Sequence, residues 1–273
     1  MLKKINKTEF KQHLKNIHVF GFTKVNNFIL PKFRKILLDR VVKEHKKIGI
    51  ETKDLKGLPA RDKKDLRVYN LPERNKIFTD LISNNNLEKF LKPLINDPYY
   101  RMLPKNLPNY IVGSFTARSS GYKLDLHIDS MFPFQGSIPI SILVLFVLEN
   151  MNEKNGATVV VPGSHLSGNY TDRELKNVKT ITANKGDVLI LDSRIWHGTT
   201  ENKTKKSRWL MNVLFTQWWL KQQVNITETI PKNILSKLSN KQKQILGYCS
   251  IPPNSERERV NTKCGYDILK NIK

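Results

Sequence analysis

The feature that most constrains the fold is a change of pattern near Pro108. Beyond it, short runs rich in β-branched and aromatic residues are separated by Gly, Pro, Asn and Ser. Residues of the first kind favour strands, and those of the second kind favour turns. Many short strands at such spacing predict a sandwich or a barrel. We expect strands over residues 109–117, 122–129, 138–149, 157–161, 178–183, 187–192 and 208–217.

The segments on either side of these strands show mainly helical spacing. We expect helices from Thr8, from Pro31 to about Ile48, from Pro72 to Ile82 and from Leu87 to Ile95, with an extended stretch over 18–25 and a surface loop over 51–70. Helical spacing returns after Thr227. We therefore predict one domain over residues 1–273, with a helical flank (1–105), a β core (106–220) and a C-terminal helical extension (221–273).

The chain is strongly basic, with 47 Lys and Arg against 24 Asp and Glu and a formal net charge of +23. A basic patch of that size would suit a nucleic acid or an anionic membrane. Residues 106–200, however, hold eight basic and eight acidic residues, so the excess lies in the flanks. We interpret most of it as a solvated surface, and we expect no nucleic-acid partner.

Other classes are excluded by what the sequence lacks. No stretch reaches the ~20 consecutive apolar residues of a membrane span, and the start at Met1 has no apolar segment like that of a secretory signal. Two cysteines, Cys249 and Cys264, are too few for a disulfide framework or a four-thiolate metal site. We expect no membrane span and a cytoplasmic location.

Three residues of the β region suit a metal ion. In an alternating strand, His127 and Asp129 project from the same face. A third candidate is His197, which lies just beyond the apolar strand at 187–192. Two histidines and one carboxylate that leave coordination positions open are the ligand set of non-haem Fe(II) oxygenases.

A cationic residue, Arg208, follows His197 by eleven positions and begins an apolar, aromatic run. An arginine facing into a barrel is costly unless a carboxylate meets it. A dicarboxylate co-substrate could supply that anion through two parallel hydrogen bonds.

Four ordered blocks of the sequence resemble the phytanoyl-CoA dioxygenase family of Fe(II)/2-oxoglutarate-dependent oxygenases. They are His127-Ile-Asp129, residues 155–165 (Asn-Gly-Ala-Thr through Pro-Gly-Ser-His), residues 186–198 (Gly-Asp-Val through Trp-His-Gly), and Arg208. The resemblance implies a double-stranded β-helix, which is a cupin-like jelly roll with the metal at its mouth, buttressed by the helices of the flanks.

The resemblance also implies cofactors and roles. His127, Asp129 and His197 would be the iron ligands and the catalytic centre. Arg208 would bind the distal carboxylate of 2-oxoglutarate, with help from the hydroxyl of Thr199. Such an enzyme uses O2, converts 2-oxoglutarate to succinate and CO2, and oxidises a C–H bond of its substrate. Related halogenases replace the carboxylate ligand by a small residue, so Asp129 favours hydroxylation, with desaturation or cyclisation as alternatives.

Further residues are assigned from their position alone. Arg118, Tyr122, Phe132 and Gln217 are candidate substrate contacts, whereas His165, in a Pro-Gly-Ser-His turn, is expected to be structural.

Two other functions stay open beside hydroxylation of a small or medium organic substrate, which the basic flanks suggest is anionic. A nucleic-acid dealkylase of the same superfamily would carry a second arginine soon after the first, but the next one here is Arg257. A metal-free jelly-roll binding module would need none of the three metal ligands. The sequence fixes neither the substrate nor the oligomeric state.

Overall fold

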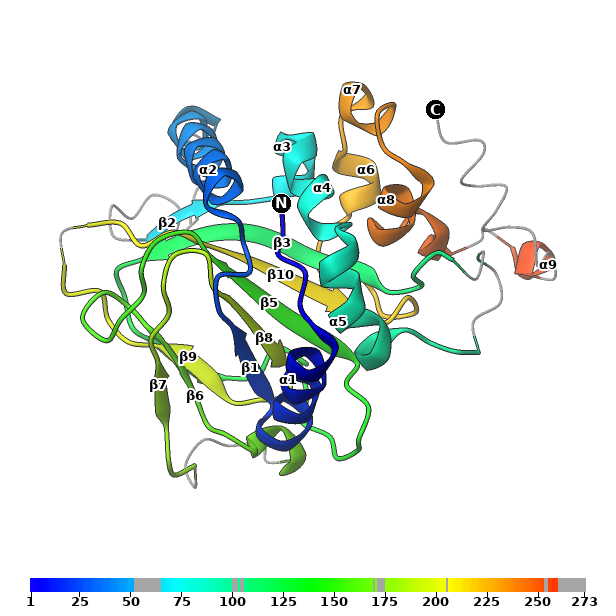
Figure 1. The fold of residues 1–273 in the computed structure, drawn as a ribbon. Coiled ribbons are helices and arrows are strands. Elements are labelled where there is room, and N and C mark those ends of the chain that lie inside the picture. Colours follow the sequence, from blue (N-terminus) through cyan, green and yellow to red (C-terminus); the bar gives the residue numbers. More distant parts are fainter. Residues whose placement is uncertain are drawn as a thin grey trace.

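The computed structural model describes residues 1–51, 65–99, 103, 106–168, 170, 175–204, 206–252 and 255–259. Two β-sheets lie face to face, and every strand pairing described is antiparallel. The larger sheet has the order β1-β8-β5-β10-β3-β2, and the smaller sheet has the order β4-β9-β6-β7. Figure 1 shows the helices α2 to α8 on one side of the larger sheet and the smaller sheet on its other side.

The strands are β1 (Phe22–Val25), β2 (Asp65–Val68), β3 (Ile111–Ser120), β4 (Leu124–His127), β5 (Ser141–Val147), β6 (Thr158–Val160), β7 (Lys179–Ile181), β8 (Val188–Asp192), β9 (His197–Thr199) and β10 (Leu210–Thr216). The α-helices are α1 (Lys7–Phe20), α2 (Pro31–Glu51), α3 (Leu71–Arg74), α4 (Lys76–Ile82), α5 (Asn85–Ile95), α6 (Ile226–Thr229), α7 (Lys232–Leu235), α8 (Asn240–Ile245) and α9 (Glu256–Arg259). Two 3-10 turns, η2 (Ser164–Leu166) and η3 (Tyr248–Ser250), complete the described elements.

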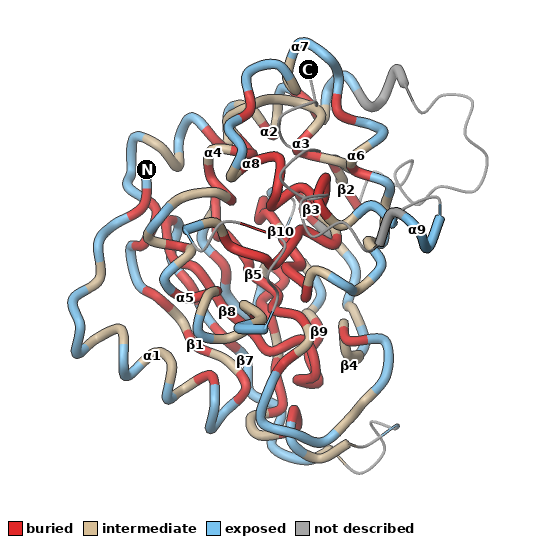
Figure 2. Tube along the Cα trace, turned by 90° about the vertical axis from the view of Figure 1, so that its right-hand side faces the viewer, coloured by how far each residue is buried: buried red, intermediate tan, exposed pale blue. Residues whose placement is uncertain are grey.

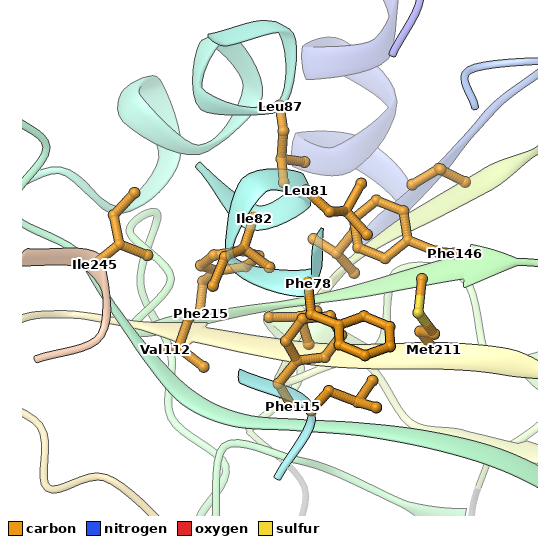
Figure 3. Packing of buried hydrophobic residues seen from close by; sticks show 14 of the residues in the cluster. Phe78, Leu81, Ile82, Leu87, Val112, Phe115, Phe146, Met211, Phe215 and Ile245 are labelled. Carbon is orange, nitrogen blue, oxygen red and sulfur yellow. The ribbon is translucent and has the colours of Figure 1, made fainter. Parts of the chain in front are cut away.

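The larger sheet is buried on both faces, as its alternating side chains show. On β10, Met211, Val213 and Phe215 point to the helices, where they join one hydrophobic cluster with residues of α4, α5 and α8. Leu210 and Leu214 point the other way, into a second cluster between the two sheets. Figure 3 shows the first cluster, with Phe78 of α4 packed edge-on against Phe115 of β3 at 6.0 Å between ring centroids. Figure 2 shows that buried segments run through the larger sheet, while α1 is exposed along much of its length.

This arrangement confirms the expected fold class, a double-stranded β-helix with flanking helices. Both edge strands of the larger sheet come from the flank expected to be mainly helical: β1 lies within the extended stretch predicted over 18–25, whereas β2 was not predicted. The predicted surface loop at 51–70 falls partly on residues 52–64, outside the described residues, and its last part forms the edge strand β2. His197 lies beyond the strand predicted at 187–192, and it begins a separate three-residue strand, β9, which was not predicted.

Asparagine caps explain the shifted helix boundaries in the first hundred residues. The Asn6 side chain accepts a hydrogen bond from the Glu9 N–H, so α1 starts before the predicted Thr8. It runs through His18 to Phe20, where Gly21 ends it at φ 80°, so only 22–25 of the predicted stretch is extended. The predicted helix over 72–82 is divided at Asn75, which has extended backbone and caps α4.

No helix in the described ranges is long and apolar enough to cross a membrane.

Candidate metal centre

The paired strands β4 and β9 bring the three predicted metal ligands together. His127, at the end of β4, lies opposite His197, at the start of β9. The two imidazole ring centroids are 4.4 Å apart. Asp129 follows β4 by two residues, and its backbone N–H donates to the carbonyl oxygen of Ser193 at 2.8 Å, which ties it to the end of β8.

The ligand atoms are close enough to share one ion. Asp129 Oδ1 lies 3.7 Å from Nε2 of His127, and its Oδ2 lies 3.5 Å from Nε2 of His197. One ligand atom from each of the three residues lies within 4.8 Å of the others. A carboxylate oxygen and two imidazole nitrogens suit a first-row transition metal such as iron.

Hydrogen bonds determine which ring nitrogen of His127 and of His197 faces the candidate metal site. Nδ1 of His127 lies 2.9 Å from the carbonyl oxygen of Asp125, and Nδ1 of His197 lies 3.0 Å from that of Ile195. A carbonyl oxygen only accepts, so each Nδ1 carries the proton and donates it. Both Nε2 atoms are then left with free lone pairs, as a metal ligand requires.

Burial favours the neutral, metal-binding form of His197. Desolvation lowers the pKa of its imidazole, and repulsion from His127 acts in the same direction, while Asp129 opposes both. His127 and Asp129 are partly exposed, so the site has one buried side and one side open toward solvent.

A cavity of about 170 Å³ adjoins these ligands. Both sheets contribute to its wall, which is polar near the metal ligands and Arg208 and apolar along β5. The lining residues are Arg118, Leu124, His127, Asp129, Leu143, Leu145, Thr158, His197, Gly198, Thr199, Arg208, Leu210 and Asn212.

Arg208 is a buried cation in this cavity, with 2% of its surface exposed. Its Nε donates to the carbonyl oxygen of Asn155 at 3.4 Å, and no ion pair with a carboxylate is found in the part of the chain that is described. Burial lowers the pKa of its guanidinium to about 10, with further repulsion from Arg118 and partial compensation from Glu149. The group is still charged at neutral pH, so the cavity presents a cation that an anionic ligand can neutralise.

Two glycines allow close backbone approaches at this site. A β-carbon on Gly156 would lie 2.9 Å from Nη2 of Arg208, and one on Gly198 would lie 2.4 Å from the carbonyl oxygen of Leu124. Next to Gly198, the Thr199 hydroxyl accepts a hydrogen bond from the Leu124 N–H at 3.2 Å. Thr199 and Arg208 both line this cavity.

Arg118 brings a second guanidinium to the cavity wall. Its Nε donates to Oδ1 of Asp65 at 2.8 Å, and Nε of Arg67 donates to Oδ2 of the same carboxylate at 2.8 Å. Burial alone would raise the pKa of Asp65, but the hydrogen bonds and charges of the two arginines lower it. Asp65 thus holds Arg118 in place from the neighbouring edge strand.

The other predicted contacts lie outside the lining of this cavity. Tyr122 and Phe132 are 44% and 50% exposed, and the Phe132 ring packs 5.5 Å from that of Phe134. Gln217 is buried just beyond the end of β10, and its Oε1 has no hydrogen-bond partner among the residues that the structure describes. His165 Nε2 lies 3.0 Å from the carbonyl oxygen of His18, consistent with its expected structural role.

Sequence reasoning missed two groups near the cavity. One is Asp65, because residues 51–70 were expected to be a loop. The other is Asn212, which strand alternation could have identified, because residues 208, 210 and 212 of a strand share one face.

The fold and these side chains define a class of protein, a double-stranded β-helix that carries two histidines and one carboxylate beside a buried arginine. The family model "Phytanoyl-CoA dioxygenase (PhyH)" matches residues 31–209. The chain belongs to the phytanoyl-CoA dioxygenase family, so the predicted family is confirmed.

Two curated relatives, one of them named a dioxygenase, are similar to parts of the chain. The protein is 25% identical over 193 residues to "Dioxygenase af480" of Aspergillus fumigatus, a match that covers 68% of this chain and 60% of the relative. It is 28% identical over 112 residues to the uncharacterized protein Rv1501 of Mycobacterium tuberculosis, covering 40% of this chain and 41% of the relative. The matches thus span about 40 to 60% of the length of these relatives.

Solved structures support the fold. The carbocyclase SnoK from nogalamycin biosynthesis, described as non-haem and α-ketoglutarate-dependent, has a TM-score of 0.61 at 13% identity, over 84% of this chain and 90% of that one. HygX from Streptomyces hygroscopicus, solved with nickel and 2-oxoglutarate bound, has a TM-score of 0.57 at 16% identity, over 78% of this chain and 88% of that one.

Proposed function

We propose that this protein hydroxylates a C–H bond of a small or medium-sized organic molecule, with conversion of 2-oxoglutarate and O2 to succinate and CO2. The observation that carries the proposal is the pairing, in one cavity, of the His127, Asp129 and His197 cluster with a buried Arg208 that forms no ion pair within the described residues. A metal site alone would suit many reactions, whereas the additional buried cation calls for a ligand with a carboxylate.

The residues fit the proposed cofactors. His127, Asp129 and His197 would hold iron(II) and leave coordination positions for a bidentate co-substrate and for oxygen. Arg208 would bind the distal carboxylate of 2-oxoglutarate through charge-assisted hydrogen bonds, and the hydroxyl of Thr199 would support it. Bound iron supplies the redox chemistry that couples decarboxylation of the co-substrate to oxidation of a substrate C–H bond.

The protein's own groups would prepare this chemistry. The backbone carbonyls of Asp125 and Ile195 hold the two imidazoles in the tautomer that ligates through Nε2. Leu143, Leu145 and Leu210 exclude water from the apolar side of the cavity. A dry wall strengthens the attraction between Arg208 and a carboxylate, since charges interact more strongly at low dielectric.

Hydroxylation is favoured over halogenation because Asp129 fills the position that halogenases leave to a halide. An anionic substrate is favoured because Arg118 adds a second guanidinium to the cavity wall and the flanks of the chain are basic.

The test is succinate release from 2-oxoglutarate in the presence of iron(II) and O2, comparing the wild type with His127→Ala. Loss of one of three ligands should abolish turnover. His18→Ala is a matched control, because the His18 side chain is exposed and lies outside the cavity lining. Equal succinate release by the wild type and His127→Ala would refute the iron assignment, and a wild type that binds no iron would leave the metal-free module as the better hypothesis.

The reaction type is read from the product. A screen of organic acids with 2-oxoglutarate present, followed by mass spectrometry, should find a product heavier than its substrate by one oxygen atom. A product lighter by two hydrogen atoms would contradict hydroxylation and indicate desaturation or ring closure. A preference for alkylated DNA or RNA would favour the dealkylase.

A further inference from the structure

The interior face of β10 carries a polar group, Asn212, in addition to Arg208, which lies two residues before the strand. Asn212 shares this face with Leu210, and both line the cavity beside the metal ligands. The Cα partners of Asn212 are Thr116 on β3 and Leu145 on β5. Asn212 therefore lies between a polar residue on one neighbouring strand and a leucine on the other.

The Asn212 side chain has unmet hydrogen-bonding capacity. Its Oδ1 is buried without a hydrogen-bond partner. Within the described ranges, neither end of its carboxamide makes a side-chain hydrogen bond. Asn212 as a whole is partly buried, but its amide oxygen is shielded from water, and a buried acceptor without a partner destabilises the fold because its desolvation is not repaid. Leucine, which resembles asparagine in size, would pack better against Leu145, so a polar group here points to a ligand.

The position of Asn212 along the strand indicates which end of that ligand it would contact. Asn212 lies four residues beyond Arg208, or about 13 Å along the strand. Strand pairing fixes the direction, because the chain runs from Arg208 through β10 to Thr216, which is the Cα partner of Ser141. The carbonyl oxygen of Ser141 accepts from the Ser193 N–H, and the Ser193 carbonyl accepts from Asp129. Asn212 is thus displaced from Arg208 toward the end of the barrel where Asp129 lies.

We infer that Asn212 is a positioning residue that hydrogen-bonds the keto-acid end of 2-oxoglutarate, opposite the end held by Arg208. This inference rests on the proposed function. A carboxamide offers an N–H2 donor to a carboxylate, and it is neutral, so it can orient this end without adding charge to a cavity that already holds two guanidiniums. Two polar contacts at opposite ends of a five-carbon diacid fix its direction as well as its place.

The test is the binding of 2-oxoglutarate by calorimetry, without oxygen and with manganese(II) in the metal site, so that no turnover is needed. Asn212→Leu should weaken binding about 10- to 100-fold, the range for a hydrogen bond to a charged group. It should also raise or preserve the melting temperature, because an unpartnered carboxamide is replaced by an apolar side chain. Asn212→Ala provides a second variant if the leucine variant does not fold.

A shortened ligand identifies which end Asn212 holds. 2-Oxopentanoate keeps the keto acid and lacks the distal carboxylate. Asn212→Leu should weaken its binding by the same factor as that of 2-oxoglutarate, whereas Arg208→Gln should weaken the binding of 2-oxoglutarate only. Ser114→Ala is the control, since Ser114 lies on β3 opposite Leu214 and outside the cavity lining.

The possible outcomes separate the two proposals. Unchanged binding by Asn212→Leu, an effect confined to 2-oxoglutarate, or a lowered melting temperature would each overturn the role of Asn212 and leave the proposed function standing. A wild type that does not bind 2-oxoglutarate in the presence of the metal would overturn the proposed function itself.

Discussion

Gly156 and Arg208 are in direct contact, so closely that a β-carbon on the glycine would lie 2.9 Å from Nη2 of the arginine. Gly156 also has a φ of +93°, a conformation that other residues adopt only at a cost. The glycine in the β-turn before β6 therefore shapes the pocket for the guanidinium.

We predict that Gly156→Ala displaces Arg208 and weakens 2-oxoglutarate binding about tenfold, since one charge-assisted contact is lost. The positive φ adds about 1–2 kcal/mol of destabilisation. Calorimetry and urea unfolding measure the two effects. Gly163→Ala is a matched control, with a φ of +81° and nothing within 4 Å of the added β-carbon. If it weakened binding equally, the contact with Arg208 would not be the cause.

A buried ion pair stabilises the loop at the end of β8. Nε and Nη2 of Arg194 donate to the Asp192 carboxylate at 2.9 and 2.7 Å, and both side chains are almost fully buried. We predict that Arg194→Met costs about 3–5 kcal/mol of unfolding free energy, because it leaves a buried carboxylate alone. Urea unfolding measures this.

The double variant Asp192→Leu/Arg194→Met tests the reason. It should lose less stability than the sum of the two single variants, since no unpaired charge remains. If the losses of unfolding free energy in the two single variants simply added up in the double variant, the interaction between the two charges would not be the cause of either loss.

Stability should also depend on pH through His13 of α1. Burial lowers the pKa of this imidazole below 6.5, and Glu9 only partly opposes the shift. As pH falls below 6.5, the unfolded chain takes up a proton that the folded chain resists, so stability is lost with acidification. The ring packs edge-on against Phe90 and lies within hydrogen-bond distance of Thr23 Oγ1.

We predict that His13→Gln, which can keep a hydrogen bond to Thr23, loses less stability than the wild type between about pH 6.5 and pH 5. Urea unfolding at a series of pH values measures the difference, and taking it between the two proteins removes the effect of other histidines. Parallel curves would contradict the assignment to His13.

The tight approach of β9 to β4 should matter for the metal. The β-carbon in Gly198→Ala would lie 2.4 Å from the Leu124 carbonyl oxygen, so the strands that carry His197 and His127 must move apart. We predict a loss of about 1–3 kcal/mol in stability and a marked loss of affinity for cobalt(II), followed by its absorption spectrum.

Gly113→Ala is the comparison variant, since its β-carbon would meet the Thr216 side chain at 2.9 Å in the other sheet. It should lose stability without losing cobalt(II) affinity. Equal loss of affinity in both variants would mean that the effect is general rather than local to the ligand strands.

The metal-ligand cluster could be predicted because its information is local. Alternation within one strand places His127 and Asp129 on one face, and the motif around His197 supplied the third residue. The contact between Asp65 and Arg118 could not be predicted, because it depends on the pairing of β2 with β3, 53 residues apart in sequence. A four-residue edge strand rich in charge carries little strand signal of its own.

Helix boundaries were less predictable for a related reason. Asn75 interrupts the expected helix because its extended backbone lets its side chain cap the next one, accepting from the Ile77 N–H. For asparagine, a position inside a helix and a position at the N-cap differ little in free energy. Packing of Phe78 and Leu81 against the larger sheet is what decides between them.

Because β10 lies between β5 and β3, the placement of its cavity residues depends on the register of the larger sheet. Its outward residues pack on the helices, and its inward positions, continued back to Arg208, form the cavity wall. A slip of one residue against β3 or β5 would bring Trp209 to the position of Arg208 and turn every side chain of the strand around. The hydrogen bonds that set the register of this strand therefore also place the residues of the cavity. A chain with the wrong register would lose both its hydrophobic core and its anion site.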